Sequence, residues 1–404
     1  MTRILSLTAL CALAASPALA GGWETGKLDT SFLYEDGNYG ELSYGSLNYA
    51  VSAETQAGTK HKMAKDQTRT SLSGKFSVGN LDIGITGFDS GAIQMDGQSA
   101  AADRDTCATA LLQKSAIEAL GVAAAIAANA QTIGLNCSIV ASADAKMDTQ
   151  SIIAKYKLSD SFSVIGGMRK VDLKSSTVGT LRTDYSIDSN SATGAVYGVS
   201  YSIPDIALRF EIIQSEAMKM NITGSATGLM AGTASSASLL GLSGNVPFAD
   251  SSELNVPQAT TVKFQTGIAE GTLLMASAHR AKWQSAQIDV NFATAASALD
   301  VASEFSDTTA YSVGLGRKFT EKTSGSLSYS WEKGAGATSG SGFTMSNGSK
   351  TLSLGLKHQI NNLSLSGGVS YTKVGDVNVS AGGLTAVYAN NSVTAFGLKA
   401  SLDF

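Results

Sequence analysis

Apolar and polar residues alternate along most of this chain, and the last nine residues show the pattern clearly. From Phe396 to Phe404 every second residue is apolar, and the residues between them are Gly, Lys, Ser and Asp. Successive side chains of a β-strand point to opposite faces. The alternation therefore predicts strands with one apolar and one polar face. It recurs at 195–203, 326–331, 352–357 and 363–371.

The alternating segments number fourteen, an even count, and their connections alternate between short and long. The predicted strands lie at 41–55, 68–79, 81–91, 148–158, 162–178, 192–203, 206–224, 257–268, 272–290, 307–319, 324–335, 347–359, 363–381 and 391–404. Six connections are short turns. Seven are long, at 56–67, 92–147, 179–191, 225–256, 291–306, 336–346 and 382–390.

Two architectures use strands of this kind. A soluble sandwich turns the apolar face inward, whereas an outer-membrane barrel turns it to lipid and keeps a polar lumen. Only the barrel requires short turns at one end and long loops at the other. We predict an all-β fold, a 14-stranded antiparallel transmembrane β-barrel over residues 41–404 with both termini on the periplasmic side. Aromatic residues near strand ends are expected to form girdles at the membrane surfaces; they are Tyr44, Tyr49, Tyr201, Tyr311, Tyr329, Trp331 and Tyr371.

The first twenty residues, MTRILSLTALCALAASPALA, have the features of a secretory signal peptide. An arginine precedes an apolar stretch, and ALA at 18–20 fits the small-residue cleavage rule. Cleavage after 1–20 leaves a chain that begins at Gly21 and is expected in the outer membrane of a Gram-negative bacterium. It also leaves two cysteines in an oxidising compartment, so we expect one disulfide between Cys107 and Cys137.

The composition argues against most enzymes and nucleic-acid-binding proteins. Charged residues make up only 15% of the chain, the formal net charge is −4, and no basic patch points to a nucleic-acid partner. The three histidines are scattered, no G-x-S-x-G motif occurs, and neither a phosphate-binding loop nor metal-ligand spacing is found. We expect no enzymatic activity, no catalytic residues, no cofactor and no bound metal.

Two of the long connections are too apolar for passive loops. Residues 92–147 contain an Ala-rich stretch in which Leu112, Ile117 and Leu120 follow helical spacing between the two cysteines. We expect a helical external loop that serves as a lid, as an apolar surface that collects ligand, or as both. Residues 225–256 also carry apolar side chains, and we expect a ligand-capture groove between the two loops. Its further candidate residues are Leu239, Leu240 and Phe248.

Residues 21–40 precede the first strand and are more apolar than a flexible tail. They contain Trp23, Leu28, Phe32 and Leu33. Since this stretch starts at the periplasmic side of the predicted barrel, we predict that it forms a plug inside the lumen. Its four apolar side chains are then candidate ligand contacts.

Three stretches of the chain are typical of one group of barrels. They are DGNYGELSYGSLNYAVS, MDTQSIIAKYKLSDSFSVIGGMRKVDLK and LNVPQATTVKFQTGIAEGTLLMASAHRAKW. These stretches resemble the FadL-type family of outer-membrane transporters for long-chain fatty acids and other hydrophobic compounds. The resemblance implies a fourteen-stranded barrel plugged by its N-terminus, with lateral exit of ligand through a kink in the third strand. The kink then falls at Gly87, Phe88 and Asp89. The family's Asn-Pro-Ala plug motif is absent, because 21–40 contains no proline.

These features lead us to expect uptake of hydrophobic molecules across the outer membrane by diffusion. The resemblance implies long-chain fatty acids as the first substrate class. The expected partners are the hydrophobic small molecule and outer-membrane lipid, and the protein is expected to be a monomer. Two alternatives stay open: a general diffusion porin, which would have a water-filled lumen, and a structural or adhesive barrel, which would need no plug.

Overall fold

The structure, a computed structural model, describes most of the chain. It covers residues 22–55, 58–96, 142–179, 183–228, 244–292, 301–334, 336, 338–339, 345–381 and 384–404. Several predicted features lie outside this description: the signal peptide at 1–20, the disulfide, the helical part of 92–147 with its three candidate residues, and Leu239 with Leu240. In the part that is described, no helix is long and apolar enough to cross a membrane.

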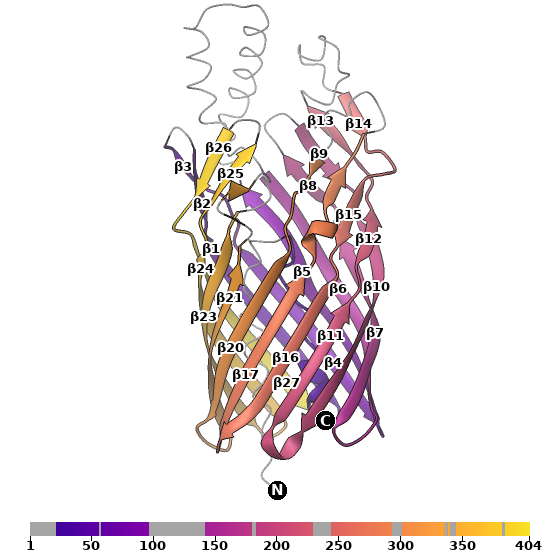
Figure 1. The fold of residues 1–404 in the computed structure, drawn as a ribbon, viewed down its shortest axis with the longest axis vertical. Helices are drawn as coiled ribbons and strands as arrows, with labels where there is room; N and C mark the ends of the chain where they lie inside the picture. Colours follow the sequence, from indigo (N-terminus) through magenta and orange to yellow (C-terminus); the bar gives the residue numbers. More distant parts are fainter. Residues whose placement is uncertain are drawn as a thin grey trace, which may run out of the picture.

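Fourteen antiparallel strands form a closed barrel (Figure 1). Each pairs with the next, and the first closes the ring by pairing with both the last and the second. The predicted fold class and strand count are confirmed. The wall strands are β1 (Tyr39–Ala50), β4 (Gln67–Val78), β5 (Leu81–Asp96), β6 (Ser142–Lys157), β7 (Phe162–Leu173), β10 (Asn190–Ile203), β11 (Leu208–Ser215), β16 (Ala259–Ala269), β17 (Thr272–Ala281), β20 (Thr308–Lys318), β21 (Thr323–Lys333), β23 (Gly348–Ile360), β24 (Leu363–Val374) and β27 (Ser392–Asp403).

Short turns lie at one end of the barrel, where the C-terminus is also found (Figure 1). Left-handed backbone conformations at Gly79, Gly271 and Asn361 allow three of these turns to be tight. The long connections lie at the other end and add short strands of their own. These are β2 (Ser52–Thr55), β3 (Lys60–Lys62), β8 (Ser176–Gly179), β9 (Thr183–Ile187), β12 (Met218–Asn221), β13 (Gly224–Gly228), β14 (Gly244–Pro247), β15 (Glu253–Val256), β18 (Ile288–Val290), β19 (Val301–Ala302), β22 (Thr338–Ser339), β25 (Val377–Ala381) and β26 (Leu384–Tyr388).

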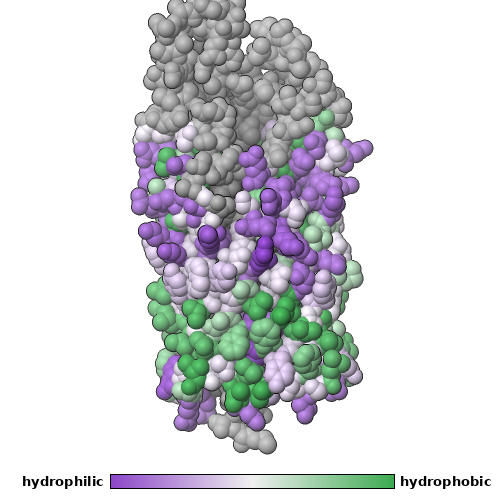
Figure 2. Space-filling model, viewed as in Figure 1, coloured by the Kyte–Doolittle hydropathy of each residue, from purple (hydrophilic) through white to green (hydrophobic). Residues whose placement is uncertain are grey.

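The two faces of the wall differ in polarity. Outward-facing side chains such as Leu72, Ile152 and Leu354 are apolar and exposed. They form a band toward the short-turn end, with polar residues above it (Figure 2). Inward-facing side chains such as Ser73 and Lys75 are polar and buried. This reverses the arrangement of a water-soluble protein and is the arrangement of a transmembrane barrel.

The sequence prediction needs three corrections. β5 continues to Asp96 and β6 begins at Ser142, so both ends of the predicted connection 92–147 belong to the wall. The predicted loop 225–256 contains β13, β14 and β15 and is not a plain loop. Tyr49 is not part of a girdle, because its strand phase turns it inward, where it is 2% exposed and donates a hydrogen bond to Gln67.

Candidate functional site in the barrel lumen

Residues 22–38, here called the N-terminal segment, lie inside the barrel. The segment follows β5 through the lumen, with Trp23 beside Gly91 and Leu33 beside Gly84, and then continues into β1. Its one regular element is a short 3-10 helix, η1 (Ser31–Tyr34). The wall surrounds the segment so completely that Trp23 and Leu33 are 2% and 0% exposed.

The lower part of the segment packs on an apolar patch of the inner wall. Phe32 and Leu33 are buried together with Ile153, Ile165, Val196 and Ile213, which come from β6, β7, β10 and β11. Gly84 of β5 makes this contact possible. A Cβ atom at Gly84 would lie 2.5 Å from Leu33 Cδ2 and 2.6 Å from Phe32 Cε2. Leu28 packs against the same group.

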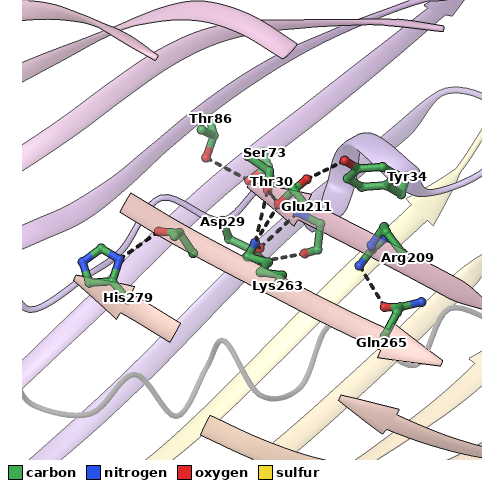
Figure 3. A network of polar contacts seen from close by, with 12 residues as sticks. Asp29, Thr30, Tyr34, Ser73, Thr86, Arg209, Glu211, Lys263, Gln265 and His279 are labelled. Carbon is green, nitrogen blue, oxygen red and sulfur yellow. Dashed lines mark hydrogen bonds and ion pairs between the residues drawn. The ribbon is translucent and has the colours of Figure 1, made fainter. Parts of the chain in front are cut away.

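A polar network ties the middle of the segment to the opposite wall (Figure 3). Lys263 Nζ lies 2.8 Å from Asp29 Oδ1 and 3.7 Å from Glu211 Oε1. Thr30 and Tyr34 each donate a hydroxyl hydrogen bond of 2.5 Å to Glu211. Burial opposes ionisation of Asp29, but Lys263 and hydrogen bonds from Ser31 prevail and hold the pKa of the Asp29 carboxyl below its usual range.

Lysines of the near wall bind carbonyl groups of the same segment. Lys155 donates to Leu33 O, and Lys75 donates to Glu35 O. Lys155 Nζ also pairs with Asp82 at 3.0 Å and lies 4.1 Å from the centre of the Tyr34 ring. The segment is therefore held by charged side chains from both sides of the lumen, and not by apolar packing alone.

The start of the segment is anchored at β17. Glu24 Oε2 lies 3.0 Å from His279 Nε2, and His279 Nδ1 lies 2.8 Å from Thr261 Oγ1. Burial raises the pKa of Glu24, but the neighbouring His279 outweighs it, so that this pKa lies below its usual value. Trp23 next to it packs edge-on against Trp283, with ring centres 5.3 Å apart.

The wall itself is interrupted between β4 and β5. The two strands pair from Val78 and Leu81 up to Ser71 and Phe88, and no further. The pairing of β5 with β6 shifts register between Asp89 and Gly91, which is the mark of a β-bulge. Beyond this point the β5 edge that faces β4 lacks its neighbour. We call the interruption the β4–β5 gap.

The N-terminal segment occupies the edge that β4 leaves. The amides of Thr25 and Gly26 donate to Ser90 O at 2.9 and 3.1 Å, and the Ala92 amide donates to Trp23 O at 3.0 Å. Gly91 is required here, because a Cβ atom would lie 2.3 Å from the Trp23 ring. The segment thus acts as a local strand partner for β5.

Side chains bridge the β4–β5 gap on both faces. On the outer face the Thr70 amide donates to Asp89 Oδ2 at 2.6 Å. On the inner face Arg69 donates to Thr25 O. Closer to the long-loop end, an isolated β-bridge between Ala64 and Met95 joins the two sides of the wall again.

Two cavities adjoin the segment or lie above it. The first, of 110 Å³, lies between the segment and β27, β1, β4 and β5, and Lys27, Arg69 and Phe88 are among its lining residues. The second, of 40 Å³, is lined almost entirely by apolar side chains such as Ile93, Met147 and Leu254. In the part of the chain that the structure describes, no cluster of His, Cys, Asp and Glu could hold a metal ion.

The structure brings most described candidate residues into one lumen. Trp23, Leu28, Phe32 and Leu33 all lie in the N-terminal segment, next to the strand that carries 87–89. Phe248 belongs to the same apolar cluster as Trp23, in an aromatic group with ring centres 6.5 Å from Tyr185 and 5.9 Å from Phe292. Sequence reasoning missed the wall partners of the segment, which are Arg69, Lys155, Glu211, Lys263 and His279. Their only signal is a charged side chain in the inward phase of a strand.

Comparison with known proteins shows what this arrangement is similar to. No family model matches the chain, and no curated protein matches it. Among solved structures, a FadL homologue of Pseudomonas aeruginosa has a TM-score of 0.68 at 12% identity, covering 97% of this chain and 98% of its own. The toluene transporter TodX of Pseudomonas putida has a TM-score of 0.61 at 13% identity, covering 96% of each chain. The toluene transporter TbuX of Ralstonia pickettii has a TM-score of 0.57 at 11% identity, covering 96% of this chain and 97% of its own. The distant resemblance to FadL-type barrels is therefore confirmed as a likeness of fold.

Proposed function

We propose that this protein is a monomeric outer-membrane transporter that takes up hydrophobic molecules, and that its ligands leave the lumen sideways through the β4–β5 gap. The observation that carries the proposal is the interrupted pairing after Phe88, where the N-terminal segment takes the place of β4 on the edge of β5. Withdrawal of a few residues there would connect the lumen to the lipid phase. The similar barrels include a FadL homologue and toluene transporters, which supports this reading.

Sideways exit has a simple physical advantage for an apolar ligand. Exposing each CH₂ group to water costs about 0.8 kcal/mol. A ligand that passes from the lumen through the wall into lipid avoids the aqueous space below the barrel. The N-terminal segment fills the lower lumen with Phe32 and Leu33, so a straight path through the barrel is blocked.

We propose long-chain fatty acids as the substrate class, because Arg69 and Lys27 bring unpaired positive charge to the first cavity beside the gap. Carboxylates line the cavity too, but Glu41 and Asp29 pair with Lys399 and Lys263, which leaves Asp89 as the third. Arg69 binds only neutral oxygens there, and its buried Nε has no hydrogen-bond partner among the described residues. Lys27 lines the same cavity and makes no ion pair within the described part of the chain. A carboxylate head group would be the partner for both. A neutral hydrocarbon would use the apolar cavity alone.

Removal of the bulge tests the proposal. Deletion of Ser90 takes out one residue between Asp89 and Gly91 and leaves both halves of β5 with their original facing. β5 can then continue its pairing with β4 and close the gap. The matched control is Ser90→Ala, which keeps the chain length and loses only the hydrogen bond to Met147 O.

We expect the deletion to reduce uptake of labelled oleate into cells at least tenfold and the control to leave it unchanged. Heat-modifiable gel mobility checks that both variants form barrels. Full uptake by a folded deletion variant would refute lateral exit. A large, steady ion conductance of the wild-type protein would instead favour the general porin.

A further inference from the structure

Three outward-facing lysines gather on neighbouring strands of the barrel. Lys333 lies at the end of β21, Lys350 near the start of β23 and Lys373 near the end of β24. All three side chains are exposed. They lie on the outer face, because they continue the phase of the lipid-facing residues Trp331 and Tyr371.

The register places two of these lysines directly opposite each other. Lys350 pairs with Lys373 across β23 and β24, and Lys350 pairs with Trp331 across β21 and β23. Lys333 is then the diagonal neighbour of Lys350. Cross-strand partners have Cβ atoms only about 5 Å apart, and like charges at such positions destabilise a sheet. An anion bound between these side chains would offset the repulsion.

The chain does not supply that anion within its described residues. None of the three lysines lies within 4.0 Å of a carboxylate there, whereas other exposed lysines do. Lys174, for example, lies 2.8 Å from Asp148, and Lys219 lies 3.2 Å from Glu253. The lysine group is therefore an uncompensated cationic patch.

The patch sits at the upper edge of the apolar band. Trp331 stacks on Tyr311 and on Tyr329 directly beside it, with ring centres 5.3 and 5.8 Å apart. Tyrosine and tryptophan occupy the membrane–water interface, where head groups lie. The residues that follow the lysines down the wall are Leu352 and Tyr371, both apolar and outward-facing.

An apolar groove lies further down the same strands, toward the short-turn end, where Phe319 and Arg317 also line it. It has a volume of 680 Å³ and is lined by outward-facing residues that include Leu327, Leu354, Leu356 and Val369. Gly367 deepens it, because this outward position has no side chain. Leu354 and Leu356 lie four and six residues from Lys350, about 13–20 Å along the strand. An acyl chain in the groove would thus place its head group at the lysines.

We propose that this face binds a phosphorylated lipid of the outer leaflet, with its phosphate on Lys333, Lys350 and Lys373 and an acyl chain in the groove. The proposal rests on the outer-membrane location proposed above. Charge complementarity selects the occupant: three ammonium groups favour an anionic head group, and basic clusters at a membrane surface attract one. The apolar groove accounts for a lipid in preference to a soluble phosphate.

Binding of lipid A, a glycolipid with two phosphates, to the purified full-length protein in detergent tests the site by native mass spectrometry. We expect the double variant Lys350→Gln/Lys373→Gln to bind lipid A at least tenfold more weakly. Gly367→Leu should also weaken binding, since its Cβ fits at 3.5 Å from Leu398 and its side chain fills the groove. Dephosphorylated lipid A should bind at least tenfold more weakly to the wild type, and equimolar inorganic phosphate should not compete.

The matched control is Lys157→Gln/Lys322→Gln, which removes two exposed charges at the short-turn end and should bind lipid A normally. Equal binding by the Lys350/Lys373 variant, or equal binding of dephosphorylated lipid, would overturn the proposal. The variant Lys350→Arg/Lys373→Arg keeps both charges and should retain lipid A binding. Its retention would show that the Gln variant loses binding through lost charge and not through misfolding. Oleate uptake should be unchanged in all these variants, so a failure of the lipid site is distinguishable from a failure of the transport proposal.

Discussion

Lys263 of β16 and Asp29 of the N-terminal segment form an ion pair inside the lumen, with Nζ 2.8 Å from Oδ1, although they are 234 positions apart in the sequence. The same ammonium lies 3.7 Å from Glu211, whose carboxylate binds Thr30 and Tyr34. The Lys263 ammonium therefore stabilises two carboxylates, Asp29 and Glu211, that fix the segment in the lumen. The position of the segment depends on this small set of contacts.

Replacement of Lys263 by Met should release the segment. The side chains of Lys263 and Asp29 are 24% and 30% exposed, but the change also leaves the buried Glu211 carboxylate without its cation, which destabilises the docked segment. We expect the ion conductance of the barrel in planar bilayers to rise severalfold, because the lower lumen opens to water. Lys322→Met at the short-turn end is the control and should conduct like the wild type. Unchanged conductance of the Lys263→Met barrel would show that the other contacts are enough to hold the segment in the lumen.

The contribution of Asp29 should depend on pH only in acid. Its pKa is lowered in the docked segment, so the docked state binds protons less readily than the released state. Ionisation of Asp29 therefore favours docking at every pH above about 4 and is lost below that value. We expect the conductance difference between the wild type and Asp29→Asn to stay constant from about pH 8 to pH 5. The difference in conductance should shrink below about pH 4. A difference that already shrinks at neutral pH would contradict the assignment of this pH dependence to Asp29.

A side chain at Gly84 should displace the lower part of the segment. The Cβ atom of Gly84→Val would overlap Phe32 and Leu33 at 2.5–2.6 Å, and the rigid wall leaves only the segment to move. We expect faster proteolysis of the segment in the folded barrel, followed by mass spectrometry of the released peptides. Gly166→Val on β7 is the matched control, because nothing lies within 4 Å of its Cβ position. Equal proteolysis of both variants would argue that the segment is held elsewhere.

Loss of Arg69 should discriminate between charged and neutral ligands. Its guanidinium lines the cavity beside the β4–β5 gap, donates to neutral oxygens and makes no ion pair among the described residues. For Arg69→Gln we expect the half-saturating concentration of oleate uptake to rise about tenfold, which is 1.4 kcal/mol of lost binding. Uptake of toluene should not change. Equal effects on the two compounds would assign Arg69 to wall structure and not to head-group binding.

The fold could be predicted from the sequence because alternation is a local signal. Residues such as Leu352 and Leu354 reveal their lipid-facing phase without any knowledge of their neighbours. The strand count and the segregation of short turns follow from the same pattern. Tyr49 was assigned wrongly, since an aromatic side chain near a strand end suits both a girdle and the lumen.

The site was less predictable, because its contacts join distant parts of the chain. The apolar content of 21–40 predicted a segment inside the lumen, and the resemblance to FadL-type barrels implied a kink at 87–89, where the pairing of β4 with β5 ends. Nothing local relates Asp29 to Lys263 or Glu24 to His279. The bulge between Asp89 and Gly91 is the place where β5 has one residue more than β6. Its position is set by the register of the two strands and not by the type of residue.

The order in which the partners of the N-terminal segment are synthesised has a consequence for folding. The segment comes early in the chain, but Glu211, Lys263 and His279 lie on β11, β16 and β17, all far downstream. Contacts of such large sequence separation form slowly. The segment thus has few partners until most of the wall exists, and its docking is expected as a late kinetic phase, after strand pairing is complete. A barrel trapped before that phase would have its strands paired but would still be open through its centre and at the β4–β5 gap.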